Sequence, residues 1–184
     1  MRAFIGIDFS KELKKKVADM QLRLKPYASS GRWKYIDNFH LTLKFLGEID
    51  LSQLSAIDRE LREICSHAQR FRLKISGAGF FPGKDCLRVL WLGLGGDVDM
   101  LNWLQRAIDT KLESIGFKKE KRGYTPHITV GQDIVFTRGF DEIKNIIDSC
   151  EFPEATVDCV YLFESEQVGG KRVYTPLGKY LLQH

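Results

Sequence analysis

The chain has 184 residues, 43% of them hydrophobic, which is enough to bury one sizeable core, so we expect a single domain over residues 1–184. The formal net charge of +4 is small, because 24 acidic side chains offset most of the 28 basic ones, and it gives only weak reason to expect an anionic partner. No apolar run approaches the roughly 20 residues of a membrane helix, and the early charges at Arg2 and Asp8 exclude a signal peptide. We expect a soluble, cytoplasmic monomer without a membrane partner, whose four cysteines are reduced.

The first half of the chain alternates between strand-like and helix-like patterns. The predicted elements are a strand over 2–9, a helix up to residue 24, extended chain near 33–36, a strand over 40–46, a helix up to about residue 69, and a strand over 71–81. Ser10 and Ser52 are suited to cap the two helices, because a serine hydroxyl accepts from the free N–H groups of a first turn. The run Ser29-Ser30-Gly31 predicts a turn after the first helix.

The second half repeats this order of elements. The predicted elements are a strand over 87–94, a helix ended by Gly116, a strand that begins at residue 127, a short helix around 143–147, and strands over 156–163 and 173–182. The offset between His40 and His127 is 127 − 40 = 87, and that between Arg88 and Arg172 is 172 − 88 = 84. A near-constant offset indicates an internal duplication about a pseudo-two-fold axis.

This duplication predicts an α+β fold with two intertwined lobes. Each lobe would hold an antiparallel sheet of three or four strands, backed by two helices. The two sheets would then face one another across a central groove.

Two copies of the pattern His-x-Thr-x provide the candidate catalytic groups. They are His40-Leu41-Thr42-Leu43 and His127-Ile128-Thr129-Val130. Because successive side chains on a strand point to opposite faces, the His and the Thr of each copy share one face, and Lys44 is expected on the face of His40. Both strands have the same parity, so both polar faces can line the groove.

Paired histidines suit acid–base chemistry at phosphorus. Imidazole titrates near pH 6.5, so one copy can be neutral and accept a proton while the other is charged and donates one. For a 2′,3′-cyclic phosphate, one histidine would take a proton from water and the other would give one to the departing ribose oxygen. The two threonine hydroxyls would hydrogen-bond the phosphate oxygens, where negative charge builds up.

Other chemistries lack support in the sequence. Two histidines without nearby carboxylate or cysteine partners make a poor zinc site, so we expect no metal. No Gly-rich phosphate loop and no nucleophile motif accompany them, so we expect no cofactor. His67 and His184 have no comparable setting, and we interpret both as structural or exposed.

Side chains just before the second motif are candidates for contacts to RNA. Arg122 closes a basic run that starts at Lys118, and a basic run beside a phosphate site can bind a nucleic-acid backbone. Tyr124 can stack on a base, as aromatic side chains do in single-stranded RNA binding. Phe39 and Trp91 lie among strand residues and are expected in the core.

With these motifs the chain resembles the RNA 2′,3′-cyclic phosphodiesterases, formerly named 2′-5′ RNA ligases, of the two-histidine phosphoesterase superfamily. The resemblance spans almost the whole chain and is carried by the segments 2–8, 38–47, 88–91 and 126–130, with Glu164-Ser165, Gly170 and Tyr174-Thr175-Pro176-Leu177 near the end. It implies a bilobed fold with a central groove and hydrolysis of a terminal 2′,3′-cyclic phosphate to a 2′-phosphate. The partner would be an RNA or oligonucleotide end.

The resemblance also implies roles for individual residues. It makes His40 the proton donor and His127 the proton acceptor, with Thr42 and Thr129 holding the phosphate. Members of the family commonly carry Arg where this chain has Gln132, and an amide supplies donors without charge. By parity Gln132 faces away from His127 unless Gly131 introduces a bulge, and Lys44 or Arg122 is the candidate replacement cation.

Three functions stay open at this point. The first is hydrolysis of RNA 2′,3′-cyclic phosphate ends. The second uses the same histidines as a 2′-5′ RNA ligase, or on 2′-5′-linked or small cyclic nucleotides. The third is a nucleotide-binding module without turnover, although such a module has no need of two proton-transfer groups.

Overall fold

A computed structural model describes the whole chain, from Met1 to His184. Its helices are α1 (Lys11–Leu24), α2 (Leu51–His67), α3 (Val98–Glu113) and α4 (Phe140–Asp148), with short 3₁₀ turns η1 (Lys25–Tyr27) and η2 (Ile36–Asn38). Its strands are β1 (Arg2–Asp8), β2 (Ala28–Trp33), β3 (His40–Glu48), β4 (Phe71–Pro82), β5 (Leu87–Gly96), β6 (His127–Phe136), β7 (Ala155–Val157), β8 (Cys159–Val168) and β9 (Lys171–Leu181). The alternating order predicted for both halves is confirmed.

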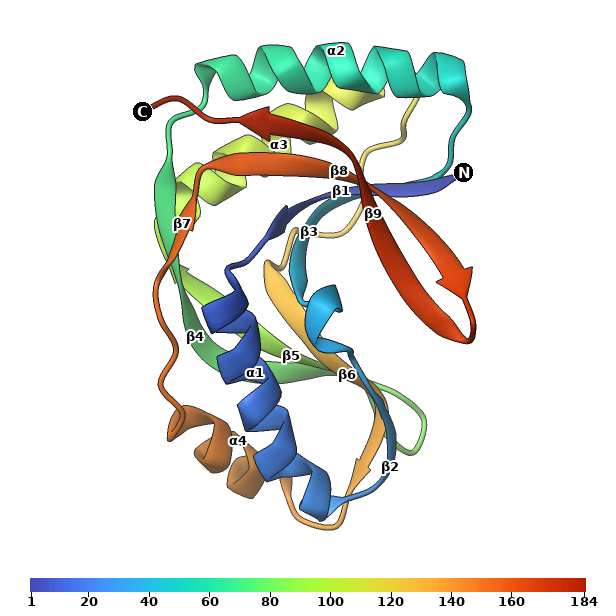
Figure 1. The fold of residues 1–184 in the computed structure, drawn as a ribbon. Coiled ribbons are helices and arrows are strands. Elements are labelled where there is room, and N and C mark those ends of the chain that lie inside the picture. The colour runs from blue at the N-terminus through green and yellow to red at the C-terminus, as the bar shows by residue number, and fades with distance from the viewer.

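The strands form one curled antiparallel sheet that divides into two halves. Its order is β7-β4-β5-β6-β3-β1-β8-β9, and β2 pairs with β6 beside this path. The halves meet where β3 and β6 share a single register pair, Leu41 with Ile128. The two predicted sheets are therefore present as the two halves of one continuous sheet, which curls around the centre of the molecule (Figure 1).

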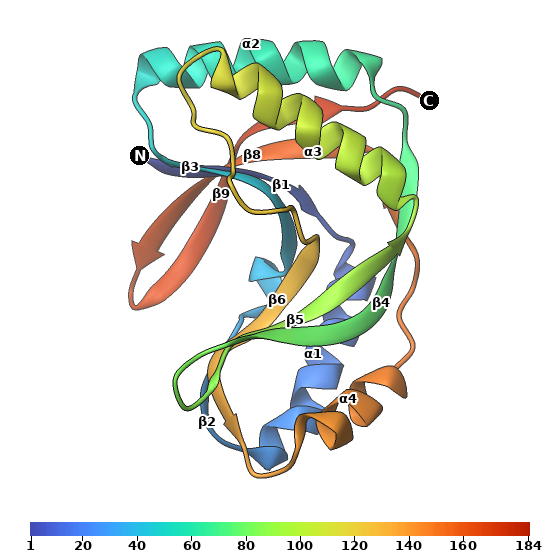
Figure 2. The ribbon, with the colours of Figure 1, turned by 180° about the vertical axis from the view of Figure 1, so that it is seen from behind.

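Each half of the sheet is covered by two helices on its outer face. Helices α2 and α3 pack together over the half that holds β3, β1, β8 and β9, and α1 and α4 pack over the half that holds β4, β5 and β6 (Figures 1 and 2). The connections cross, because α1 follows β1 yet covers the other half. A single cluster of 36 buried apolar residues runs through both halves. None of the helices combines the length and the apolar character that a membrane span requires.

Two local predictions were wrong in detail. The Ser29-Ser30-Gly31 run lies inside strand β2, where Gly31 has a φ of 148° and stands against Ile134 with no room for a Cβ atom. Helix α2 begins two residues earlier than expected, because Asp50 and not Ser52 is its N-cap. The Asp50 carboxylate accepts from the Gln53 backbone N–H, and the Gln53 side chain accepts from the Asp50 N–H. Ser10 caps α1 as predicted.

The prediction that Lys44 shares the face of His40 is wrong, because strand β3 contains a bulge. Gly6 of β1 pairs with Thr42, and the next residue, Ile5, pairs with Lys44, so Leu43 is left without a partner. Beyond this point the parity is reversed, and Phe45 is exposed where Lys44 is buried.

Lys44 ties the strand to the helical layer. Its Nζ atom forms an ion pair with Asp109 of α3 and donates to the Lys118 carbonyl at 2.8 Å. The Lys44 side chain is 1% exposed and that of Asp109 is 13% exposed. Because water is excluded, each charge depends on the other for its stabilisation.

Removal of one charge of this pair should therefore destabilise the fold. We expect Lys44→Met to lower the free energy of unfolding by about 3–5 kcal/mol, since it leaves the Asp109 carboxylate buried without a partner. The double variant Lys44→Met/Asp109→Leu should recover most of the loss. Urea unfolding measures both changes.

The exposed Lys15 provides the control, because its ion pair with Asp19 lies in solvent. Lys15→Met should change the free energy of unfolding by less than about 0.5 kcal/mol. A Lys44→Met protein with normal stability and weakened binding of phosphate would contradict the structural role.

Candidate active site

The inner surface of the curled sheet forms a groove of about 650 Å³ that receives residues from both halves. The structure brings His40, Thr42, His127 and Thr129 together in this groove. Its lining consists of Arg2, Ala3, Phe4, Arg32, Trp33, Lys34, Tyr35, Asn38, His40, Thr42, Phe45, His127, Thr129, Gln132, Ser165, Gln167, Gly170, Arg172 and Tyr174. Both His-x-Thr motifs therefore face one cavity.

The ring of His40 is fixed by two hydrogen bonds. Its Nδ1 atom lies 2.8 Å from the Asn38 carbonyl oxygen, which can only accept, so Nδ1 carries a hydrogen. Its Nε2 atom lies 3.0 Å from Thr42 Oγ1. In the neutral ring Nε2 has no hydrogen, so the threonine hydroxyl donates to it. Nε2 is thus the atom that can exchange a proton within the groove.

His127 is held in the same way. Its Nδ1 atom lies 2.6 Å from the carbonyl oxygen of Thr125, two residues earlier in the chain, as Asn38 is two residues before His40. This hydrogen bond again leaves Nε2 free for proton transfer. The duplication has therefore preserved the ring orientation and the tautomer as well as the residue type.

The aromatic surroundings of the two rings differ. His40 lies between Phe4, at 4.7 Å between ring centroids, and the edge of Tyr174, at 4.9 Å. His127 meets Phe81 at 5.3 Å and Trp91 at 6.1 Å.

The surroundings of His40 favour its neutral form. Burial lowers the pKa of His40 from its ordinary value near 6.5 to about 4, and Lys34 and Lys14 act in the same direction. The Asn38 carbonyl and the Asp8 carboxylate raise the pKa, and their effect is smaller than that of burial. At neutral pH the free groove therefore holds an uncharged His40.

A bulge brings Gln132 into the groove. On the pairing of β5 with β6, Leu90 opposes Gly131 and Trp91 opposes Thr129, so Val130 is the extra residue. Gln132 consequently lies on the side of His127 and lines the groove. Phe45 holds the equivalent place after the bulge of β3, at 132 − 87 = 45, and also lines it.

The cation that pairs with Gln132 across the sheet is Arg32, and not Lys44 or Arg122, the replacements for the family Arg that were expected from the sequence. Arg32 of β2 pairs directly with Gln132, lines the groove, and forms an ion pair with Asp133. Asp133 adopts a left-handed conformation, with a φ of 53°. Arg32 thus lies opposite Gln132 in the sheet, and its guanidinium is paired with Asp133.

Three of the residues singled out from the sequence lie outside the groove lining. Lys44 is buried against α3, and Arg122 is exposed in the segment between α3 and β6. Tyr124 is packed against the core, and burial raises the pKa of its hydroxyl. That hydroxyl donates to the Thr42 carbonyl at 2.9 Å, so Tyr124 positions strand β3 and is not available for stacking on a base. Phe39 is buried as expected.

Several groove residues were missed because they come from elements far along the chain. Tyr174 and Arg172 lie on the β8–β9 hairpin, and Asn38 joins this hairpin to the first motif by donating from Nδ2 to the Arg172 carbonyl at 2.8 Å. The repeated Arg-Val dipeptide and the family-like segments near the end of the chain were the sequence signals at this hairpin, and neither indicated a position in the groove.

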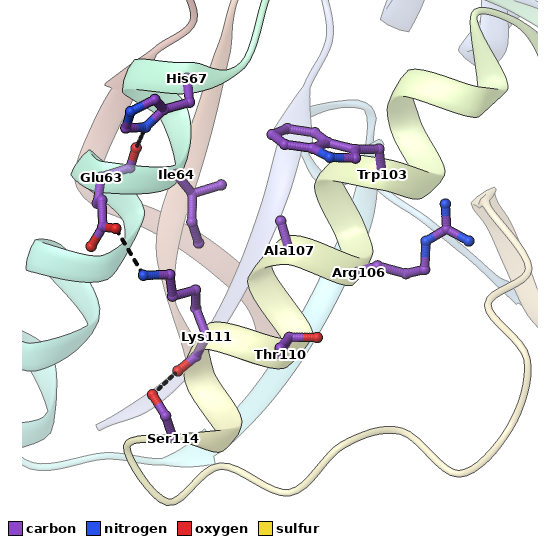
Figure 3. Close-up of a pocket in the computed structure, with 9 residues that line it drawn as sticks. All are labelled: Glu63, Ile64, His67, Trp103, Arg106, Ala107, Thr110, Lys111 and Ser114. Atoms are coloured by element: carbon purple, nitrogen blue, oxygen red, sulfur yellow. Dashed lines mark hydrogen bonds and ion pairs between the residues drawn. The ribbon is translucent and has the colours of Figure 1, made fainter.

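A second hollow lies between α2 and α3, away from both motifs (Figure 3). Its wall includes the ion pair of Lys111 with Glu63, at 2.8 Å, and the indole of Trp103. His67 also lines it and contacts the Glu63 carbonyl. This hollow contains a single histidine, and its threonine, Thr110, comes from the other helix. The groove, which brings both His-x-Thr motifs together, is therefore the candidate active site.

Known proteins resemble the chain in sequence and in fold. The model of the family described as LigT-like phosphoesterase matches residues 7–91. An RNA 2′,3′-cyclic phosphodiesterase of Methanothermobacter thermautotrophicus is 31% identical over 96% of each chain, and one of Thermotoga maritima is 32% identical over 90% of this chain and 87% of its own. The crystal structure of E. coli LigT complexed with 3′-AMP superposes with a TM-score of 0.82 at 26% identity, covering 100% of this chain and 98% of that one.

The depressed pKa of His40 gives a measurable prediction. In the free protein we expect the His40 ring to titrate near pH 4. Inorganic phosphate in the groove should raise this pKa by roughly 1 to 3 units, because an anion close to the ring stabilises the imidazolium. Ring-nitrogen NMR across a pH series, with and without phosphate, measures the change.

Sodium chloride at the same ionic strength is the control, and His67 provides an internal reference outside the groove. A His40 that titrates near 6.5 in the free protein would show that burial does not control its charge. An unchanged pKa in phosphate would show that the anion binds elsewhere.

Proposed function

The chain belongs to the family of LigT-like phosphoesterases that includes the RNA 2′,3′-cyclic phosphodiesterases, and we propose that its groove hydrolyses the 2′,3′-cyclic phosphate at an RNA end to a 2′-phosphate. The observation that carries the proposal is the pair of imidazoles. Both are held through Nδ1 by backbone carbonyls, and both face one groove beside a threonine hydroxyl. Two such groups can move two protons in one displacement at phosphorus.

In the proposed reaction His127 is the base and His40 is the acid. A water molecule attacks phosphorus and gives a proton to Nε2 of His127, while the bond from phosphorus to the ribose 3′ oxygen breaks. Nε2 of His40 gives its proton to that oxygen, which becomes a hydroxyl. The product is a 2′-phosphomonoester with a free 3′ hydroxyl, and one water molecule is consumed.

The substrate supplies the charge that protonates His40. The free groove disfavours the imidazolium through burial and through Lys34, whereas the phosphodiester brings a negative charge to the ring. The proton donor is therefore formed when the substrate is bound. An imidazolium with an intrinsically low pKa is also a strong acid, which suits protonation of an alkoxide leaving group.

Thr42 and Thr129 hold the phosphate in this proposal. The Thr42 hydroxyl donates to neutral His40 in the free groove and becomes available to a phosphate oxygen once His40 is protonated. Thr129 holds the equivalent position beside His127. Hydroxyl donors directed at the non-bridging oxygens stabilise the charge that accumulates in the transition state.

One chain supplies both halves of the groove, so the proposed acting unit is the monomer. The proposed setting is the cytoplasm, where the four free cysteines stay reduced. A 2′-5′ joining reaction would use the same groups, with the 5′ hydroxyl of a second RNA in place of water as the nucleophile and the ribose 3′ oxygen again as the leaving group. A binding-only module would leave unexplained why both ring tautomers are fixed.

The activity is tested with an oligonucleotide that ends in a 2′,3′-cyclic phosphate, in the presence of a chelator. We expect a 2′-phosphate product, and His40→Ala and His127→Ala should each lower kcat by roughly 10²- to 10⁴-fold. The double variant should lose little more than either single variant, because the two groups act in one step.

His67→Ala is the matched control and should retain wild-type kcat, since His67 lies on helix α2 outside the groove. Absence of hydrolysis by the wild-type protein would overturn the proposed function. Hydrolysis that requires an added metal would overturn the mechanism.

A sulfur substitution separates the acid from the base. When the 3′ oxygen of the cyclic phosphate is replaced by sulfur, the leaving group is a thiolate, whose conjugate acid has a pKa of roughly 8.5 and needs no proton donor. His40→Ala should then regain most of its lost rate, while His127→Ala should not. Release of the thiol, followed with a disulfide reagent, measures the rates.

Rescue of His127→Ala in place of His40→Ala would reverse the two roles. Wild-type protein on both substrates provides the reference rate, so that an intrinsic effect of sulfur is divided out.

A further inference from the structure

The groove carries positive charge that nothing in the protein neutralises. Its lining contains four cationic side chains and no carboxylate. One of the four, Arg32, has an ion-pair partner in Asp133. Arg2, Lys34 and Arg172 have none.

Lys34 and Arg172 are close enough to repel one another. Both side chains are half-buried. Burial lowers the pKa of Lys34, and Arg172 and Arg32 lower it further. Two partly desolvated cations without a counter-ion cost free energy, so their arrangement is better explained by a ligand than by the stability of the fold.

The backbone holds both residues in place. The Lys34 N–H donates to the Val130 carbonyl of β6 at 3.1 Å, and the Lys34 carbonyl accepts from Gln21 at 3.0 Å. The Arg172 carbonyl accepts from the buried Asn38 side chain at 2.8 Å. The two cations are thus held at fixed positions, the first directly after strand β2 and the second on the β8–β9 hairpin.

The unpaired charge lies on one side of the catalytic pair. Burial raises the pKa of the Tyr174 hydroxyl, and the charges of Arg172 and Arg2 oppose this rise. The ring of Tyr174 lies 4.9 Å from that of His40, centroid to centroid, and the pKa of His40 is itself lowered by burial and by Lys34. Beside His127 the groove presents the neutral Gln132 and the paired Arg32. The positive electrostatic potential of the groove is therefore strongest on the His40 side.

A cyclic phosphate carries one negative charge, which three unpaired cations exceed. We propose that Lys34 and Arg172 bind the phosphodiester that precedes the terminal nucleotide, so that the RNA chain leaves the active site on the His40 side, between the β2–β3 connection and the β8–β9 hairpin. This inference rests on the proposed hydrolase function. It makes the substrate an oligonucleotide end in preference to a mononucleotide.

The test uses three substrates with the same 2′,3′-cyclic terminus. They are a mononucleotide, a dinucleotide with a normal phosphodiester linkage, and the same dinucleotide with an uncharged methylphosphonate linkage. For the wild-type protein we expect kcat/KM to be about tenfold higher for the charged dinucleotide than for the uncharged one. The logarithm of kcat/KM for the charged dinucleotide should also fall more steeply with the logarithm of salt concentration than that of the mononucleotide, by about 0.7 per contacted phosphate.

Variants then assign the preference to particular side chains. Arg172→Gln and Lys34→Gln should each reduce the charged-to-uncharged ratio to about threefold or less, because the charge of one partner has been removed. Arg88→Gln is the matched control. Arg88 is an exposed arginine followed by valine at the equivalent place of the first half, it lies outside the groove lining, and its variant should keep the wild-type ratio.

The outcomes separate the inference from the function on which it rests. Wild-type hydrolysis of all three substrates with a ratio near one would overturn the inference and leave the hydrolase function standing. A tenfold ratio that persists in both variants would overturn the assignment to Lys34 and Arg172. No hydrolysis of any substrate would overturn the proposed function and the inference together. Dividing each rate by that of the same variant on the mononucleotide removes any general effect on chemistry or folding.

Discussion

The arrangement of the site depends on one point of contact between the two halves of the sheet, the pairing of Leu41 with Ile128. Each of these residues follows a motif histidine directly, so the two motifs meet at equivalent positions and in opposite directions. This places the pseudo-two-fold axis at the pair and sets His40 and His127 on the same face. Because Leu41 and Ile128 are almost completely buried under the helices, a slip by one residue would expose them and is strongly disfavoured. The register that brings the histidines together is thus maintained by the core.

From identical parts the fold makes two chemically different histidines. Both rings donate from Nδ1 to a carbonyl two residues earlier, which is a local property of the motif and its strand. The difference comes from long-range neighbours. The β8–β9 hairpin brings Tyr174 against His40, and Lys34 adds a like charge, whereas His127 contacts Phe81 and Trp91. A neutral histidine in a desolvated, positively charged pocket responds strongly to an arriving anion.

The sequence predicted the order of elements, the duplication and the four motif residues, because these follow from local periodicity and from spacing. It failed where strand parity is broken. Bulges at Leu43 and Val130 turn Lys44 into the core and Gln132 into the groove. Gly131 indicated that the second bulge was possible, whereas no residue on β3 indicated the first. Tyr124 was misassigned for another reason. Its hydroxyl finds a backbone carbonyl on β3, a partner 82 residues away that only the packed structure reveals. Arg172 is remote in the same sense, since the hairpin that carries it reaches the groove through a hydrogen bond to Asn38.

Lys44 and Lys34 show how the surroundings of a charge indicate its use. Lys44 is almost fully buried, and its ammonium group is paired with Asp109 and the Lys118 carbonyl. Its charge therefore stabilises the fold and is not available to a ligand. Lys34 is less buried, yet it faces Arg172 and Arg32 and has no carboxylate partner. A fold selected for stability alone would pair or replace such a residue, because uncompensated like charges raise the free energy of the native state. His40 is a second such case, because burial keeps its ring neutral at neutral pH. The groove therefore contains two electrostatically unfavourable features, the unpaired cations and the buried neutral histidine. In the proposed function a single ligand class, the anionic backbone of an RNA end, compensates both.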